Sequence, residues 1–150
     1  MYENDYFYPT LLLYPDDSKL ISPSGRVYTC SSDIQNDLMN YDNLSSNYLA
    51  SFAFSSDGNG IIALQSDYYY NYPNNLTIYS KDNYDILGYV ENFFNVPEHI
   101  VVNGDDIKLI SQYNYGIIAE VLSYSDLISG GGKMLGKPVK EKFYFPKKLK

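Results

Sequence analysis

A short pattern recurs three times along this chain and constrains its fold more than any other feature. Each copy consists of an apolar run, a polar turn that contains aspartate, and a second apolar run. The copies span Leu11–Ser22, Phe52–Ala63 and Ile100–Ser111, and they align with one another without a gap. Internal repetition indicates one supersecondary unit that stacks against further copies of itself. The sequence therefore predicts a fold built from a repeated unit.

The residues at the middle of each copy are typical of a tight turn. Asp and Asn side chains accept hydrogen bonds from the backbone that follows them, and glycine adopts positive φ at no steric cost. We expect Gly58 and Gly104 to take up that conformation. The flanking runs are short and nearly continuously apolar, which is typical of strands covered on both faces. Each copy is therefore predicted to be a β-hairpin that neighbouring copies cover.

The spacing of the turn aspartates indicates how many strands each unit contains. It is 41 residues from Asp16 to Asp57 and 48 residues from Asp57 to Asp105. Propeller blades of four strands repeat every ~40 to 50 residues. Further strands are therefore expected after the hairpins, namely third strands at Arg26–Cys30, Leu76–Tyr79 and Gly116–Val121, and a fourth strand of the middle copy at Ile86–Val90.

Two of these hairpins resemble a known class of repeats. Pro15–Ser22 (P-D-D-S-K-L-I-S) and Phe54–Ala63 (F-S-S-D-G-N-G-I-I-A) are similar to the S-P-D-G-x-x-L-A hairpin of WD-repeat, YVTN-like and TolB-like β-propellers. The resemblance covers roughly Thr10–Val121. It implies an all-β fold, a partial β-propeller of about three four-stranded antiparallel blades. The blades are expected at about residues 7–48, 49–96 and 97–122 onward, within a propeller region 1–122 that a basic, glycine-containing segment 123–150 follows.

Three blades are fewer than the ~4 to 8 that close a propeller of this kind. An open arc leaves apolar faces on its first and last blades, and such faces act as interaction surfaces or promote aggregation. We therefore expect either that the chain is the C-terminal part of a larger propeller or that several copies assemble into a ring. A different all-β arrangement, such as a small sandwich, stays open. Met1–Pro9 could supply an outer strand to a neighbouring blade.

Charge is distributed unevenly along the chain. Met1–Gly132 contains 4 basic and 17 acidic residues, whereas Lys133–Lys150 contains 7 Lys against Glu141 alone. An acidic body repels phosphate, so nucleic acid is not expected as a partner. The basic end is expected to lie against the acidic body, with contact to an anionic surface as the alternative. No apolar run reaches the ~18 residues of a membrane span, so none is predicted.

The chain after Val121 follows the repeat less closely. Ser123–Ser129 could form a short helix or an outer strand. Gly130–Gly132 is predicted to be a flexible break. Lys142–Phe145 alternates enough to form one more strand. This end of the chain is therefore either a closing strand or a disordered tail.

The sequence contains no convincing catalytic group, metal site or cofactor site. His99 is the only histidine and Cys30 the only cysteine, which excludes a multi-histidine metal site and leaves little room for a catalytic pair. Gly131–Lys137 has the spacing of a phosphate-binding loop, but Pro138 stands where Ser or Thr would hold magnesium. The acidic turns lack the alternating ligands and closing Glu of a calcium loop, so they are interpreted as turns, with weak calcium binding at one as the alternative. The compartment stays open.

Tyrosines gather in the predicted loop Asp67–Asn75, at Tyr68, Tyr69, Tyr70 and Tyr72. Exposed aromatic side chains beside Asn and Asp commonly bind a sugar ring or a protein. We predict that these four tyrosines bind a ligand, with packing over the blade edge as the alternative. The expected function is a non-catalytic binding or scaffold module for a protein or glycan partner. The alternative is a piece of a glycan-processing or peptidase propeller whose active site lies on other blades.

Overall fold

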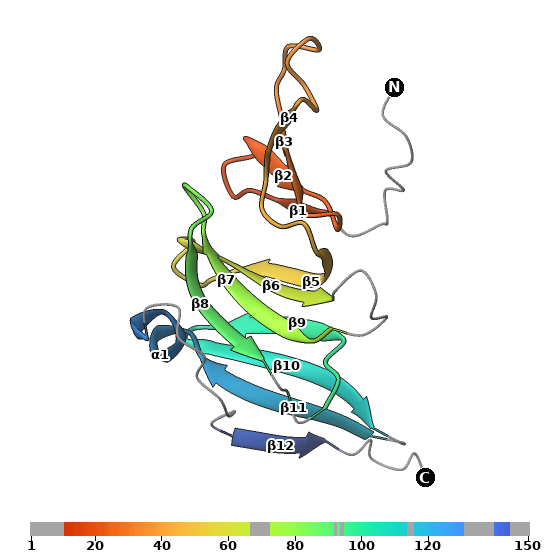
Figure 1. The fold of residues 1–150 in the computed structure, drawn as a ribbon, viewed down its shortest axis with the longest axis vertical. Helices are drawn as coiled ribbons and strands as arrows, with labels where there is room; N and C mark the ends of the chain where they lie inside the picture. Colours follow the sequence, from red (N-terminus) through yellow and green to blue (C-terminus); the bar gives the residue numbers. More distant parts are fainter. Residues whose placement is uncertain are drawn as a thin grey trace. The chain divides into compact units, whose positions relative to one another are not determined.

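The chain forms three four-stranded antiparallel sheets, drawn in Figure 1 from a computed structural model that describes residues 11–66, 73–91, 93, 95–113, 116–130 and 140–144. In each sheet the strands are hydrogen-bonded in the order in which they occur along the chain. The all-β fold class with three four-stranded antiparallel sheets is confirmed. In a propeller blade, strands that are consecutive in the chain are also neighbours in the sheet. The strands are β1 (Leu12–Leu13), β2 (Lys19–Ile21), β3 (Arg26–Thr29), β4 (Asn40–Asn43), β5 (Tyr48–Phe54), β6 (Gly60–Ser66), β7 (Asn75–Ser80), β8 (Ile86–Glu91), β9 (His99–Asn103), β10 (Asp106–Tyr113), β11 (Gly116–Ser123) and β12 (Lys140–Tyr144).

The chain divides into two compact units, Met1–Leu49 and Ala50–Lys150. The sheet of β1 to β4 belongs to the first unit. The second unit holds the sheet of β5 to β8, apart from the first residues of β5, and the sheet of β9 to β12. The predicted third strands are confirmed as β3, β7 and β11, and the predicted fourth strand of the middle copy as β8.

The first two hairpins have the same turn. In the first, the backbone N–H of Tyr14 donates to the carbonyl of Lys19 at 2.8 Å, and Asp17 has a φ of 57°. In the second, the N–H of Ser55 donates to the carbonyl of Gly60 at 2.8 Å, and Gly58 has a φ of 72°. Each pair of hydrogen-bonded residues encloses a four-residue loop whose third residue has positive φ. These two copies therefore correspond position by position, as the sequence alignment predicts.

The third hairpin has a different turn, and the gapless alignment is wrong there. Asn103 pairs with Asp106, which leaves only Gly104 and Asp105 in the loop. Gly104 has a φ of 61° at the first loop position, the place that type II′ hairpin turns reserve for glycine. The positive φ predicted for Gly104 is confirmed, but its loop is two residues shorter than the loops of the other copies.

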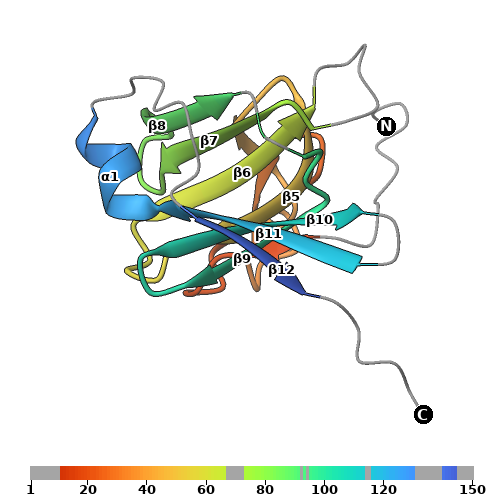
Figure 2. The same ribbon diagram turned by 90° about the horizontal axis from the view of Figure 1, so that it is seen from below.

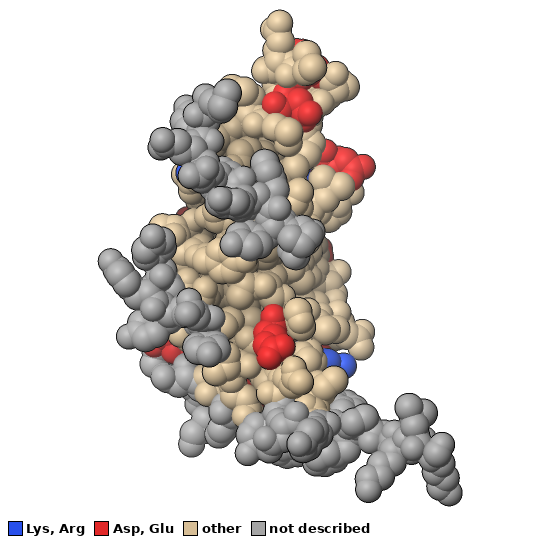
Figure 3. Space-filling model, turned by 90° about the vertical axis from the view of Figure 1, so that its right-hand side faces the viewer, with Lys and Arg blue, Asp and Glu red and all other residues tan. Residues whose placement is uncertain are grey.

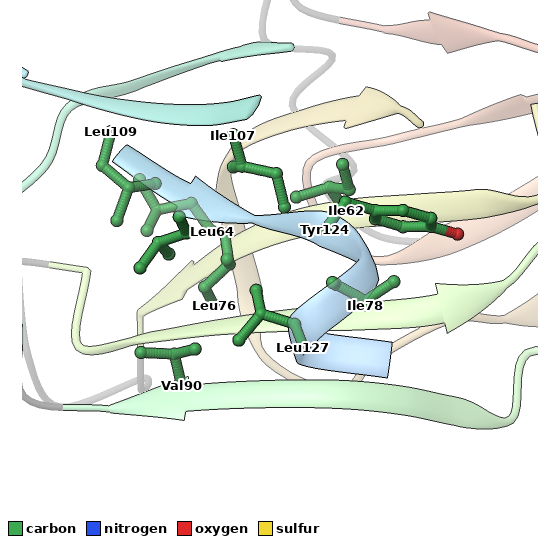
Figure 4. Close-up of a cluster of buried hydrophobic side chains, with 10 residues drawn as sticks. Ile62, Leu64, Leu76, Ile78, Val90, Ile107, Leu109, Tyr124 and Leu127 are labelled. Carbon is green, nitrogen blue, oxygen red and sulfur yellow. The ribbon is translucent and has the colours of Figure 1, made fainter. Parts of the chain in front are cut away.

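The hydrophobic core of the second unit lies between its two sheets. Ile62 and Leu64 from β6 face Ile107 and Leu109 from β10 across this interface (Figure 4). Each of these four side chains is fully buried. The cluster consists of Ile62, Leu64, Leu76, Ile78, Val90, Ile107, Leu109, Leu122, Tyr124 and Leu127.

The apolar runs predict strands that are buried on both faces, and the strands differ in how far they meet this prediction. Every residue of β6 is buried, so the prediction is confirmed for this central strand. Side chains of β9 instead alternate between exposed and half-buried, so this strand is covered on one face only. The difference follows from position, because β6 is an inner strand and β9 is the edge strand of its sheet.

A short helix, α1 (Tyr124–Ser129), closes one end of the core (Figure 2). The hydroxyl of Ser123 caps it by accepting a hydrogen bond from the N–H of Asp126. Two glycines allow the helix to approach the second sheet, because a Cβ at Gly60 would lie 2.5 Å from the Tyr124 hydroxyl and one at Gly88 would lie 2.9 Å from the Leu127 carbonyl oxygen. The structure thus decides between the two interpretations of Ser123–Ser129 in favour of a helix.

The strand predicted near the C-terminus is present. β12 pairs with β11 in antiparallel register, with Val121 opposite Lys140 and Ile117 opposite Tyr144. It therefore completes the third sheet. Met1–Pro9, residues 131–132 of the predicted glycine break and the Gly131–Lys137 loop lie outside the described residues.

Replacing Ile62 with Ala should lower the free energy of unfolding by about 2–5 kcal/mol, because it leaves a cavity in the interface between the sheets. Ile86→Ala is the matched control in the same sheet, since that side chain is 58% exposed. It should cost about 1 kcal/mol or less, from lost strand propensity alone. Urea denaturation followed by circular dichroism measures both changes. Equal losses in the two variants would contradict the position of the core.

Candidate binding surfaces

The predicted ligand-binding tyrosines belong to the connection between β6 and β7. Tyr68, Tyr69, Tyr70 and Tyr72 lie outside the described residues, so their role stays a prediction. The ends of the connection are described. The N–H of Asn74 donates to the carbonyl of Gln65 at 2.9 Å and continues the pairing of β6 with β7. The connection is therefore fixed at its base by a hydrogen bond between its two ends.

A group of buried polar side chains lies at the base of this connection. The side-chain amide of Gln65 donates to the Tyr79 hydroxyl at 2.5 Å. The Thr77 hydroxyl donates to the side-chain oxygen of Asn75 at 3.3 Å, and the Asn75 amide donates to the Asn74 side chain at 2.8 Å. Buried polar groups that are hydrogen-bonded specify one arrangement of their strands. The sequence analysis missed this group, whose signal is the polar residues that interrupt the apolar pattern of the two strands.

The carboxylate of Asp57 is occupied by its own turn. It accepts hydrogen bonds from the Ser55 hydroxyl at 2.5 Å and from the N–H of Asn59 at 3.0 Å. The Ser55 hydroxyl in turn accepts a hydrogen bond from the backbone N–H of Gly60 at 2.8 Å. The hydrogen bond from Ser55, followed by that from the Asn59 backbone, holds the pKa of Asp57 below its ordinary value. This carboxylate therefore stabilises the hairpin turn.

Asp105 ties the third hairpin to the start of α1. Its carboxylate accepts hydrogen bonds from the Ser123 hydroxyl at 2.6 Å, the Ser125 N–H at 2.8 Å and the Ser125 hydroxyl at 3.0 Å. The Asp105 carbonyl also accepts the N–H of Tyr124 at 2.8 Å. The hydrogen bond from Ser123 comes first among the causes that lower the pKa of Asp105. The side chain fixes where the helix begins.

Within the described residues, no three His, Cys, Asp or Glu side chains come together in a way that could hold a metal ion. At the first turn, Asp16 accepts hydrogen bonds from the N–H of Ser18 at 3.1 Å and from its hydroxyl at 2.6 Å. All three acidic turns thus direct carboxylate oxygens to neighbouring backbone and hydroxyl donors. The geometry fits the interpretation of these segments as turns.

Cys30 and His99 belong to different units of the chain. Cys30 follows β3 in the first unit and is half-buried. Burial, and then the carboxylates of Asp37 and Asp17, raise the pKa of this thiol, so the thiolate form is disfavoured. His99 opens β9 in the second unit, where it is exposed. These surroundings favour neither residue as a nucleophile or base.

A buried carboxylate lies in the interface between the second and third sheets. Glu120 is opposite Leu109 in the pairing of β11 with β10, so it shares the face of the core residues. It is 1% exposed and accepts the N–H of Asn95 at 2.8 Å. Ser111 is equally buried, and its hydroxyl has no hydrogen-bond partner among the described residues. Glu120 therefore connects the third sheet to the segment between β8 and β9.

The connection between β3 and β4 presents apolar side chains that the sequence analysis did not single out. Ile34, Leu38 and Met39 are 90%, 53% and 56% exposed. Tyr41, in β4, is 55% exposed, and the Lys19 ammonium lies 3.8 Å from the centre of its ring. The signal that could have revealed this surface is the placement of three large apolar residues within a run of Asp, Asn, Gln and Ser.

No protein-family model matches this chain, and no curated protein does. Among solved structures it is similar to the β-propeller domain of Cps50 (Swd1) from Myceliophteria thermophila. The two share 16% sequence identity with a TM-score of 0.43, and the match covers 75% of this chain and 36% of that chain. In the described residues no helix has the length and apolar character to cross a membrane.

Replacing Ser55 with Ala should raise the pKa of Asp57 toward its ordinary value, because the largest cause of its lowering is removed. Carbon-detected NMR titration of the carboxyl groups measures this pKa. Asp105 is the internal control, since its carboxylate is held by Ser123 and Ser125. An unchanged Asp57 pKa would contradict the hydrogen bond.

The same shift has a consequence for stability. A carboxyl whose pKa is lower in the folded protein than in the unfolded chain stabilises the fold above the unfolded pKa, and this contribution is lost as pH falls through the folded pKa. Wild-type protein should therefore lose more stability than Ser55→Ala as the pH falls from about 4 downward.

Proposed function

We propose that the chain is a non-catalytic binding or scaffold module that binds a protein or glycan partner through the tyrosines of the β6–β7 connection. The observation that carries this proposal is the closed base of that connection, where the Asn74 N–H is bonded to the Gln65 carbonyl. A loop fixed by a rigid sheet is the usual place for binding residues. Tyr68, Tyr69, Tyr70 and Tyr72 supply its aromatic groups.

Tyrosine suits this role for physical reasons. Its ring offers a large contact area with few rotatable bonds, so little conformational entropy is lost when a partner orders it. The ring face can stack on a sugar or an apolar side chain, and the hydroxyl can hydrogen-bond to either. Four tyrosines in five consecutive residues, with Asn71 between them, combine both kinds of contact.

The surroundings of the acidic groups support a non-catalytic function. The pKa values of Asp57 and Asp105 are lowered by hydrogen bonds, which Asp57 accepts from Ser55 and Asn59 of its own turn and Asp105 accepts from residues at the start of α1. A general acid at neutral pH instead needs a raised carboxyl pKa. Both side chains therefore stabilise local structure. The loops are the part of the molecule that we propose for recognition.

We further propose that the outer face of the third sheet is covered by additional blades, supplied by a longer parent chain or by another copy. Val101 and Ile117 lie on the face of this sheet opposite the core and are 48% and 49% exposed. A propeller blade normally has a neighbour on each face. Residues Met1–Lys150 alone should therefore self-associate.

Light scattering over a concentration series tests this expectation. The weight-average mass of Met1–Lys150 should rise with concentration, and Val101→Ser combined with Ile117→Ser should reduce the rise because it lowers the apolar area available for contact. Ile86→Ser, at the exposed first residue of the edge strand β8, is the control and should behave like wild type. A monomer at all concentrations would contradict the proposal of an open sheet face.

Replacing Tyr68, Tyr69 and Tyr70 together with Ala should leave the fold intact and weaken binding to ligands found on glycan and protein arrays. Loss of stacked aromatic contacts should reduce affinity at least about tenfold, as expected for residues at the centre of an interface. Tyr48→Ala, which truncates an exposed tyrosine in β5, is the matched control. Isothermal calorimetry on the strongest array ligand measures the change. Unchanged affinity of the triple variant would remove this loop as the binding site.

A further inference from the structure

The connection between β3 and β4 is a second exposed surface, and it is well ordered by hydrogen bonds. Thr29 makes three of these hydrogen bonds. Its N–H donates to the Met39 carbonyl at 3.0 Å, its carbonyl accepts the Leu38 N–H at 2.9 Å, and its hydroxyl donates to the Asn36 carbonyl at 2.6 Å. One threonine thus fixes three points of the connection, so its apolar residues are held in place before any partner binds.

The tip of the connection is held by a second set of hydrogen bonds. The Asp33 carboxylate accepts the Gln35 N–H at 3.1 Å and the Asn36 side-chain amide at 2.8 Å. The Asp33 carbonyl accepts the Asn36 N–H at 2.9 Å, which forms a turn around Ile34. Ile34 therefore stands on a closed turn with 90% of its side chain exposed. An isoleucine on a rigid turn is a suitable anchor, because little entropy is lost when it is buried.

The charged residues of the connection itself are all acidic, and the Lys19 ammonium from β2 lies over the ring of Tyr41 in β4. From Cys30 to Tyr48 the chain carries Asp33, Asp37 and Asp42 and no Lys or Arg. Figure 3 shows red carboxylate side chains among the tan surface at the end of the first unit where the β3–β4 connection lies. Burial is the largest cause of the raised pKa of Cys30, and the negative charges of Asp37 and Asp17 raise it further. Complementary charge steers association, so a partner for this surface should be positive.

We propose that the β3–β4 connection binds a protein partner. Ile34, together with Leu38 and Met39 of the same connection, docks into an apolar pocket on the partner, and Lys or Arg residues border that pocket. A lipid surface fits less well, because anionic headgroups repel the three aspartates. A glycan fits less well, because Ile34, Leu38 and Met39 have no aromatic ring to stack on a sugar. The surface is distinct from the tyrosine connection, and this inference stands whether or not the tyrosines bind a ligand.

A selection experiment tests the chemistry of the partner. A phage-displayed library of disulfide-cyclised random peptides is selected on the full chain, and the enriched peptides are synthesised. They should combine Lys or Arg with apolar residues. Their affinity should be at least tenfold lower for Ile34→Ser than for wild type. Because Ile34 is 90% exposed, this substitution should leave the fold intact. Ile86→Ser is the matched control, an exposed isoleucine elsewhere in the chain, and should bind like wild type.

Charge is tested separately from apolar contact. Asp33→Asn and Asp37→Asn both remove a negative charge. Asn at 37 keeps an oxygen for the Ser31 N–H, and Asn at 33 keeps one for the Gln35 N–H but loses the acceptor of the Asn36 side-chain amide. The double variant should bind the basic peptides several-fold more weakly at low salt, and the difference should shrink in 0.5 M NaCl. Tyr68→Ala, Tyr69→Ala and Tyr70→Ala together should leave this binding unchanged, which separates the inference from the proposed function.

Several results would overturn the inference. Enriched peptides that bind Ile34→Ser as tightly as wild type, or that carry no excess of Lys and Arg, would place recognition elsewhere. Binding of wild type, but not Ile34→Ser, to phosphatidylcholine vesicles would make the surface a lipid contact. A concentration-dependent dimer that Ile34→Ser abolishes would make a second copy its occupant.

Discussion

The packing of the second sheet against the third determines most of this structure. Ile62 and Leu64 of β6 meet Ile107 and Leu109 of β10, and all four side chains are removed from water. Burial of this kind is the dominant favourable contribution to folding. It explains why Ile62 and Leu64 of β6 are apolar, and Leu127 and Tyr124 of α1 extend the same core. Gly60 and Gly88 lie beneath the helix, where an added Cβ would come within 2.5 Å of the Tyr124 hydroxyl and 2.9 Å of the Leu127 carbonyl oxygen respectively.

Several acidic side chains of this chain stabilise local structure. Asp57 orders a four-residue turn, Asp105 links a hairpin to a helix, and Asp33 closes a turn around an exposed isoleucine. A carboxylate that accepts two or three hydrogen bonds from nearby backbone and hydroxyl groups has little capacity left for chemistry. It still contributes negative charge to the surface. The same residues therefore give the loops fixed shapes and favour positively charged partners.

Recognition surfaces are expected on connections that the sheets hold at both ends. The β6–β7 connection is closed at its base by Gln65 and Asn74, and the β3–β4 connection is organised by Thr29. In an antiparallel sheet of consecutive strands, the β6–β7 connection leaves at the end opposite to the turns of β5–β6 and β7–β8. A four-stranded unit can thus present different loops at its two ends without changing its core.

The sequence by itself determined the hairpins and most strands, because turn chemistry and apolar runs are local properties. The positive φ of Gly58 and the strand at Ile86 follow from a few neighbouring residues. Only the tertiary structure decided the two-residue turn at Gly104, the helix at Tyr124 and the burial of Glu120. The helix and the burial of Glu120 depend on packing between residues far apart in the chain, and the length of the turn depends on the register in which β9 pairs with β10. The sequence did not reveal the exposure of Ile34 either. An apolar residue can be identified as exposed only when the residues that form the core are known.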